Sequence, residues 1–281
     1  MPLNSSLPNG TLKVAGSTVA VIKKHIELQL QLPSTTCYIY FTNVPLAIGQ
    51  QSNKHPIEIF GIKGARICYG EGARDLIVKL VDGPHEVAHY AFTKTILEQT
   101  CAMNLKSELA FIGSGRVTSK DLSKDLSKDP DASFSPWTLP PGRARQWPAV
   151  VAECGYSEST RHLRAIADLW ISNSDGDVKV HLIISIERAK AKIIMEKWVP
   201  GQTARSTGPS LRSHGQHARR EQELVITKAR TEMFLRPLVP PTEHDFVIDA
   251  AELEDIAREI FSFVSSFFIV ALTYFGEPGF G

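Results

Sequence analysis

Two acidic residues at the ends of short strand-like segments are the residues of this chain best suited to chemistry. Asp131 follows Pro130 and opens the segment 131–135, and Glu153 follows the apolar run 149–152. If the two strands pair, their carboxylates lie close together. Mg²⁺ takes oxygen ligands and is usually held by one or two carboxylates together with substrate phosphates. The pair therefore predicts a magnesium site of the kind that hydrolyses a phosphodiester.

Each acidic candidate also has a structural interpretation. Asp131, after a proline, could be a turn or strand-entry residue. Glu86 lies in the first turn of an expected helix, where a carboxylate complements the helix dipole. Glu153 ends a fully apolar segment, and a buried carboxylate needs a partner or a metal. Both interpretations stay open for Glu86 and Asp131, whereas the surroundings of Glu153 favour a functional role.

Composition sets few limits on function. The chain has 281 residues, 43% of them hydrophobic, which is enough for one large domain or two small ones. The formal net charge is +1, so any contact with a polyanion depends on local clusters. The four cysteines are far apart, which excludes a CxxC metal knuckle and does not require disulfides. The polar N-terminus predicts no signal peptide, and we expect an intracellular protein of the cytoplasm or nucleus.

The hydrophobic pattern divides the chain into three parts. Residues 1–83 are expected to be a β-rich N-terminal extension, 84–236 a core, and 237–281 a linker and an apolar C-terminal helix. The apolar segment 260–275 is shorter than the roughly 20 residues of a bilayer span, so we expect a buried helix and no membrane partner. Helices are predicted over 17–30, 82–103 and after 159, strands over 37–44, 57–62, 75–81, 178–187 and 192–199, and a hairpin from 109–112 and 116–118.

Two polar segments stand between the expected elements. The tetrapeptide Asp-Leu-Ser-Lys at 121–124 repeats at 125–128 and is expected to be an exposed loop without a function. Residues 201–220 contain no acidic side chain and are expected to form a basic loop. Two interpretations of this loop stay open, a segment that holds phosphates and a merely solvated, disordered segment. Arg164 also stands four residues before Asp168, which predicts a surface ion pair. The candidate nucleic-acid residues are Arg161, Arg164, Arg205, Arg212, Arg219 and Arg220.

Five motifs follow one another between residues 85 and 198. They are His85-Glu86-Val-Ala, Pro130-Asp131-Ala-Ser-Phe, the segment from Trp147 to Ser159, Asp177-Val-Lys-Val and Ile194-Met-Glu-Lys-Trp198. Together they resemble the PD-(D/E)XK nuclease-like superfamily, in particular its uncharacterised fungal-type members. The resemblance implies a mixed α/β fold with a restriction-endonuclease-like αβββαβ core, in which helices flank a mixed sheet. It further implies that Glu86, Asp131 and Glu153 surround one or two Mg²⁺ ions.

The lysine of the E-x-K pattern is missing. Side chains two residues apart on a strand share a face, and the residue two after Glu153 is Gly155. Lys179, at the start of the next expected strand, is the predicted substitute. We therefore expect a Mg²⁺-dependent phosphodiester hydrolase acting on DNA, with catalytic Asp131, Glu153, Lys179 and Glu86 and no small-molecule cofactor. The alternative, which Gly155 favours, is an inactive nuclease-fold module that binds nucleic acid or protein.

Overall fold

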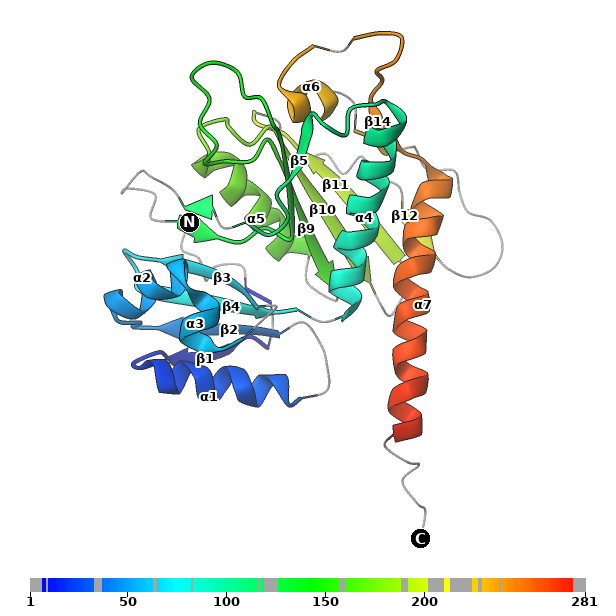
Figure 1. The fold of residues 1–281 in the computed structure, drawn as a ribbon. Coiled ribbons are helices and arrows are strands. Elements are labelled where there is room, and N and C mark those ends of the chain that lie inside the picture. The colour runs from blue at the N-terminus through cyan, green and yellow to red at the C-terminus, as the bar shows by residue number, and fades with distance from the viewer. Residues whose placement is uncertain are drawn as a thin grey trace.

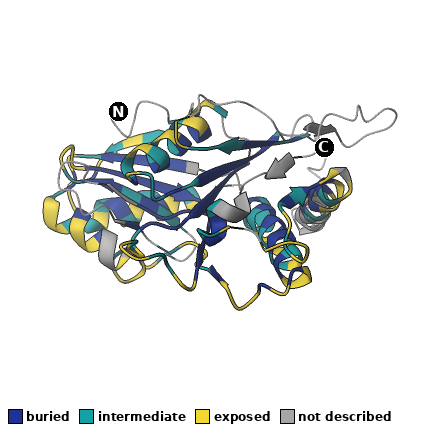
Figure 2. Cartoon of the chain, turned by 90° about the horizontal axis from the view of Figure 1, so that it is seen from above, coloured by how far each residue is buried: buried dark blue, intermediate teal, exposed yellow. Residues whose placement is uncertain are grey.

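The protein is a mixed α/β molecule built on two six-stranded mixed sheets, with helices outside them (Figure 1). The computed structural model describes residues 7–8, 10–32, 37–62, 65–81, 83–115, 117–118, 126–156, 160–187, 192–201, 210–212, 224–226, 229–237 and 239–274. Figure 2 shows that the strands of both sheets are largely buried, whereas exposed residues gather on the helices and loops. The mixed α/β fold class that the resemblance implies is confirmed.

The first sheet has the strand order β1-β2-β4-β3-β7-β6 and carries α1, α2 and α3. Its core contains Ile22 and Ile26 from α1, Ile39 and Phe41 from β2, and Leu76 from β4. The bounds are β1 Leu12–Ala15, α1 Val19–Leu30, β2 Cys37–Thr42, α2 Leu46–Lys54, α3 Pro56–Phe60, β3 Ala65–Gly70, β4 Asp75–Leu80, β6 Val117–Thr118 and β7 Leu126–Lys128. Because β6 and β7 come from residues beyond 83, this sheet is not confined to the expected N-terminal extension.

The second sheet has the order β12-β11-β10-β9-β8-β5, and only β9 and β10 run parallel among its pairs. The bounds are α4 Gly83–Ala102, β5 Leu109–Phe111, β8 Ala132–Pro136, β9 Val150–Tyr156, α5 Thr160–Asn173, β10 Val180–Glu187, β11 Lys192–Trp198 and β12 Ser210–Arg212. Omitting the excursion through β6 and β7, the order α4-β5-β8-β9-α5-β10 is the αβββαβ core that the resemblance implies.

Alternation along β9 sends its side chains to two different cores. Val150, Ala152 and Cys154 pack with α4 and with α7, which spans Ala250–Tyr274. On the other face, Val151 packs with Trp170 of α5. The remaining elements are α6 Ala229–Phe234 and the two-stranded sheet of β13 Leu224–Ile226 and β14 Phe246–Ile248. The face that carries Val151 is also the face of Glu153, so the candidate site lies on the α5 side of the sheet.

Two local predictions are wrong. The segment 57–62 was expected to be a strand, but Pro56 begins α3 and Gly61, with φ 71°, ends it. The expected hairpin over 109–118 does not form, because β5 pairs with β8 in the second sheet while β6 pairs with β7 in the first. In both cases the apolar pattern identified a structured segment, but it gave the wrong type of element for 57–62 and the wrong strand partner for 109–118.

The C-terminal helix is longer than its apolar segment, because α7 begins at Ala250. Its first turns pack against α4 through Leu253, Ile256 and Ile260. Within the described part of the chain, no helix is both long and apolar enough to span a lipid bilayer.

Candidate active site

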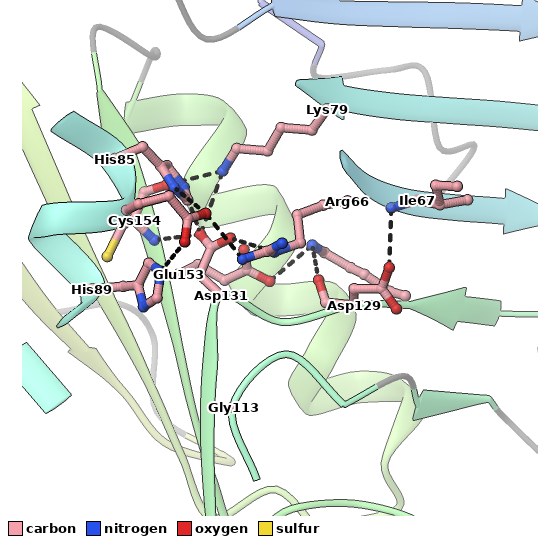
Figure 3. A network of polar contacts seen from close by, with 12 residues as sticks. Arg66, Ile67, Lys79, His85, His89, Gly113, Asp129, Asp131, Glu153 and Cys154 are labelled. Atoms are coloured by element: carbon pink, nitrogen blue, oxygen red, sulfur yellow. Dashed lines mark hydrogen bonds and ion pairs between the residues drawn. The ribbon is translucent and has the colours of Figure 1, made fainter. Parts of the chain in front are cut away.

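The two acidic candidates face each other across neighbouring strands. Ala132 of β8 pairs with Ala152 of β9, which places the preceding residue, Asp131, across from Glu153. Both residues are only 1% exposed. Figure 3 shows them inside a network of polar side chains at the junction of the two sheets. The register therefore brings together two of the three residues that the sequence predicted as metal ligands.

Asp131 is held by groups from three different parts of the chain. Its Oδ2 accepts a hydrogen bond from the Cys154 amide at 2.8 Å and lies 3.0 Å from His85 Nε2 of α4. The Lys79 ammonium of β4 lies 3.4 Å from the same oxygen and donates to the Cys154 carbonyl at 3.0 Å. Burial alone would raise the pKa of Asp131, but the charges of His85 and Lys79 hold it well below its usual range.

Glu153 is held through one of its two oxygens. Oε1 accepts a hydrogen bond from the Trp170 indole at 2.9 Å and lies 2.8 Å from the Lys128 ammonium at the end of β7. That ammonium also lies 5.9 Å from the centre of the Trp170 ring, within the range of a cation–π interaction. Burial raises the pKa of Glu153 above its usual value, although the charge of Lys128 opposes this shift. The protein therefore destabilises the charged form of Glu153 unless further positive charge arrives.

The hydrogen bonding of this network is incomplete. Asp131 Oδ1 and Glu153 Oε2 are buried and have no hydrogen-bond partner among the residues that the structure describes. Such buried polar groups cost about 1–3 kcal/mol each, so a cluster of them indicates a bound water, ion or ligand. Two carboxylate oxygens on facing strands fit the ligand preference of Mg²⁺, which takes one or two carboxylates and completes its shell with water and phosphate. The residues present thus fit the predicted ion.

Glu86 lies at the edge of the network and is not brought into contact with the other two acids. Its Oε1 is 3.1 Å from Arg66 Nη2, and its Oε2 is 2.8 Å from His89 Nε2. The nearby imidazole of His85, the hydrogen-bonded His89 and the charge of Arg66 lower the pKa of Glu86. Among the described residues, no three His, Cys, Asp or Glu side chains are grouped to hold a metal, because the Arg66 guanidinium lies between Glu86 and Asp131.

The predicted substitute lysine is placed elsewhere. The Lys179 ammonium donates to the Gly176 carbonyl, three residues before it in the chain. Its position is four residues before Ile183, the β10 partner of Glu153, which corresponds to about 13 Å along the strand. The expectation that Lys179 reaches Glu153 is therefore wrong. Lys128 and Lys79 of the first sheet are the amines beside the two acids.

The predicted nucleic-acid residues have different environments. Arg161 is exposed on α5. Arg164, one turn later, binds the buried carboxylate of Glu196 on β11 rather than Asp168, so the surface pair predicted with Asp168 is wrong. Of the basic loop, Arg212 lies in β12, and Arg205, Arg219 and Arg220 lie outside the described residues.

Sequence reasoning missed four residues at the site, Arg66, Lys79, Lys128 and His181, although two of them carried a signal. Lys79 stands inside the apolar run 75–81, and a lysine in such a strand is rarely buried without a partner. Lys128 stands three residues before Asp131, within the repeated tetrapeptide that was expected to have no function. His181 of β10 shares the face of Glu153, is fully buried, and has no hydrogen-bond partner for either ring nitrogen within the described chain. A lone histidine in a hydrophobic strand gave no indication in the sequence that it would be buried on the face of Glu153.

Comparisons with known proteins add little to this description. No protein-family model matches the chain, and no curated protein matches it. One solved structure that matches is described as a candidate nuclease belonging to DUF820 from Anabaena variabilis ATCC 29413. It is 14% identical, the match covers 50% of this chain and 74% of that chain, and the TM-score is 0.36. A likeness of that size carries no conclusion about the function of this chain.

Proposed function

We propose that this chain is a Mg²⁺-dependent phosphodiester hydrolase of nuclease-like type that acts on DNA. The observation that carries the proposal is the pair of buried carboxylate oxygens, Asp131 Oδ1 and Glu153 Oε2, that lack hydrogen bonds in the described chain on facing strands. When bound there, Mg²⁺ supplies a Lewis acid that polarises the scissile phosphate and lowers the pKa of an attacking water.

The residues of the chain have separable tasks in this proposal. Asp131 and Glu153 hold the ion. Lys128 takes the role of the lysine missing at Gly155, because its ammonium already lies 2.8 Å from Glu153 and can stabilise negative charge on the phosphate. Lys79 fixes the orientation of Asp131 and of the Cys154 carbonyl, so that the ends of β8 and β9 keep their spacing.

Binding of DNA is assigned to basic residues other than those of the network. Arg161 is exposed at the start of α5, the helix that follows Glu153, and is free to contact a phosphate from the solvent. Arg205, Arg212, Arg219 and Arg220 supply further positive charge between residues 201 and 220. Neutralising several phosphates in this way makes the affinity for DNA fall steeply with salt. Arg164 contributes least, because its guanidinium is engaged by Glu196.

A second candidate, the inactive module that binds nucleic acid or protein, has its own supporting observation. Lys79, Lys128 and Arg66 come from the first sheet, whereas Asp131 and Glu153 belong to the second. These contacts join the two sheets. Of the five residues that make them, all except Arg66 are less than 10% exposed. In this candidate the network has only that joining role, and the surface alone carries function.

A plasmid nicking assay with and without Mg²⁺ separates the two candidates. Asp131→Asn, Glu153→Gln and Lys128→Met should each reduce the Mg²⁺-dependent rate at least about a hundredfold, the usual scale for losing one preorganised charge. Lys179→Met is the matched control and should retain the rate, since its ammonium binds only the local Gly176 carbonyl in the described contacts. Nicking that survives in Asp131→Asn and Glu153→Gln would contradict the proposal. DNA binding without nicking in the wild type would favour the inactive module.

A further inference from the structure

The side chain of Arg66 stands between two of the three acids that the sequence motifs assign to one ion. Its Nη2 lies 3.1 Å from Glu86 Oε1, and its Nε lies 3.6 Å from Asp131 Oδ1 (Figure 3). Arg66 belongs to β3 of the first sheet, whereas Glu86 is in the first turn of α4 and Asp131 precedes β8. A single positive group from the first sheet thus connects both carboxylates.

Arg66 contacts Asp131 through an ion pair that contains no hydrogen bond. The 3.6 Å separation is too long for a hydrogen bond, and neither Arg66 Nε nor Asp131 Oδ1 has another hydrogen-bond partner among the described residues. The other oxygen of Asp131 is, by contrast, contacted by Cys154, His85 and Lys79. Withdrawal of the guanidinium therefore breaks no hydrogen bond to Asp131, and it exposes the oxygen that the proposed ion needs.

The neighbouring charges also oppose the guanidinium. Arg66 pairs directly with Lys79 across β3 and β4, and like charges at such positions repel each other. A divalent cation at Asp131 would add a third positive centre to this group. The Glu86 side chain is 45% exposed and the Arg66 side chain 12%, so this edge of the network meets the solvent at Glu86.

We infer that Arg66 occupies the position between Glu86 and Asp131 in the ion-free protein and excludes Glu86 from the metal site. A divalent cation held by Asp131 and Glu153 gains Glu86 as a further ligand only when the guanidinium withdraws. The first sheet thereby controls how tightly the second sheet binds its ion. This inference rests on the proposed function, because it requires that the facing acids bind a metal.

Binding of Mn²⁺, followed by electron paramagnetic resonance as a probe for the divalent site, tests the inference. Arg66→Met should bind Mn²⁺ at least about tenfold more tightly than the wild type, the scale on which neighbouring groups alter metal affinity. Arg66→Lys, which keeps the charge, should gain much less. Adding Glu86→Gln to Arg66→Met should abolish the gain, because the inference assigns that gain to Glu86.

The outcomes distinguish this inference from the proposed function. If Mn²⁺ binds the wild type and is lost in Asp131→Asn, but Arg66→Met binds no more tightly, only the inference about Arg66 is overturned. A gain that persists in the Arg66→Met/Glu86→Gln double variant also overturns it. If neither the wild type nor any Arg66 variant binds Mn²⁺, both the inference and the metal-dependent function fail.

A second measurement on the wild type avoids dependence on the folding of Arg66→Met. Modification of arginines by phenylglyoxal, read out by mass spectrometry, should be slow at Arg66 without metal and at least about threefold faster with saturating Mn²⁺, as expected for local opening of a protected group. Arg236, which is bound by Glu108 and Glu243 at a distance from this network, is the internal control. An unchanged rate at Arg66 would overturn the inference.

Discussion

Two buried glutamates lie in one row of the second sheet and differ in a single respect. Glu153 pairs with Ile183, and Ile183 pairs with Glu196, so the three residues share a face across β9, β10 and β11. Each glutamate is 1% exposed. At Glu196, the Arg164 guanidinium donates to both carboxylate oxygens and the Trp198 indole donates to Oε2. At Glu153, only Oε1 has hydrogen-bond partners within the described chain.

The comparison separates an acid that stabilises the fold from one that is prepared to bind a ligand. A buried carboxylate whose oxygens both accept from a guanidinium already has its counter-charge, so it gains less from an ion, and its partner serves to offset the cost of burial. A buried carboxylate with one oxygen unbonded retains that cost until something binds. Burial and charge alone would not distinguish Glu153 from Glu196. The completeness of their hydrogen bonding does.

The largest effect on stability is expected at Glu196, because Arg164 donates to both of its carboxylate oxygens. Arg164→Met removes the guanidinium from Glu196 and leaves a buried charge without its main partner. We expect the free energy of unfolding to fall by about 3 kcal/mol, the low end for breaking a buried pair because the Arg164 side chain is half-exposed. Arg161→Met, on the exposed side of the same helix, is the control and should change stability by less than about 0.5 kcal/mol. Chemical denaturation of both variants measures the difference, and equal stabilities would contradict the structural role of Glu196.

A smaller, pH-dependent effect is expected at His181, which lies on the same face of β10 as Ile183. Burial, followed by the charge of Lys128, lowers the pKa of His181 to about 3. Between pH 6.5 and 3 the unfolded chain binds a proton at this histidine and the folded chain does not, so stability falls as the pH falls. From pH 6 to pH 5, the wild type should lose about 1 kcal/mol more of unfolding free energy than His181→Asn.

Denaturation curves at the two pH values measure this loss. His55→Asn, at an exposed histidine, should follow the wild type. If His181→Asn loses as much stability between the two pH values as the wild type does, His181 is not held neutral in the folded protein. The group of buried side chains with incomplete hydrogen bonding then does not extend to His181.

The smallest effect on stability is expected at Glu153, which has hydrogen-bond partners for only one carboxylate oxygen within the described chain. Glu153→Gln alone would leave the buried Lys128 ammonium without its counter-charge, so the double variant Glu153→Gln/Lys128→Met, which removes both charges, is the variant to compare. The free energy of unfolding of the double variant should change by no more than about 1 kcal/mol, in contrast to the loss at Arg164→Met, which removes one partner only. Thermal and chemical unfolding of the double variant check this. A loss as large as that of Arg164→Met would show that Glu153, like Glu196, serves the fold.

The sequence predicted most of the core elements because their patterns are local. The apolar stripe of Leu163, Ala167 and Trp170 predicted α5, and all three residues are buried. The apolar run before Glu153 predicted β9 and the burial of its acid. Both signals depend only on spacing within one element.

The partners of the acids could not be predicted in the same way. The side chains of Lys79 and Arg66 reach Asp131 from positions 52 and 65 residues earlier in the chain. Their contacts depend on how the first sheet meets the second, which no single periodicity encodes. Lys179 was chosen because it follows Glu153 in the chain, but strand register places it about 13 Å away. Register and the contact between sheets are long-range properties, and they decide which lysine belongs to the site.

The most direct test of the account is calorimetric titration of Mg²⁺ into the wild type, Glu153→Gln and Glu196→Gln. The account predicts that Glu196→Gln binds Mg²⁺ as the wild type does, whereas Glu153→Gln binds at least about tenfold more weakly. Equal affinities in all three proteins, or an equal loss in both variants, would contradict the claim that the unbonded oxygen of Glu153 marks an ion site.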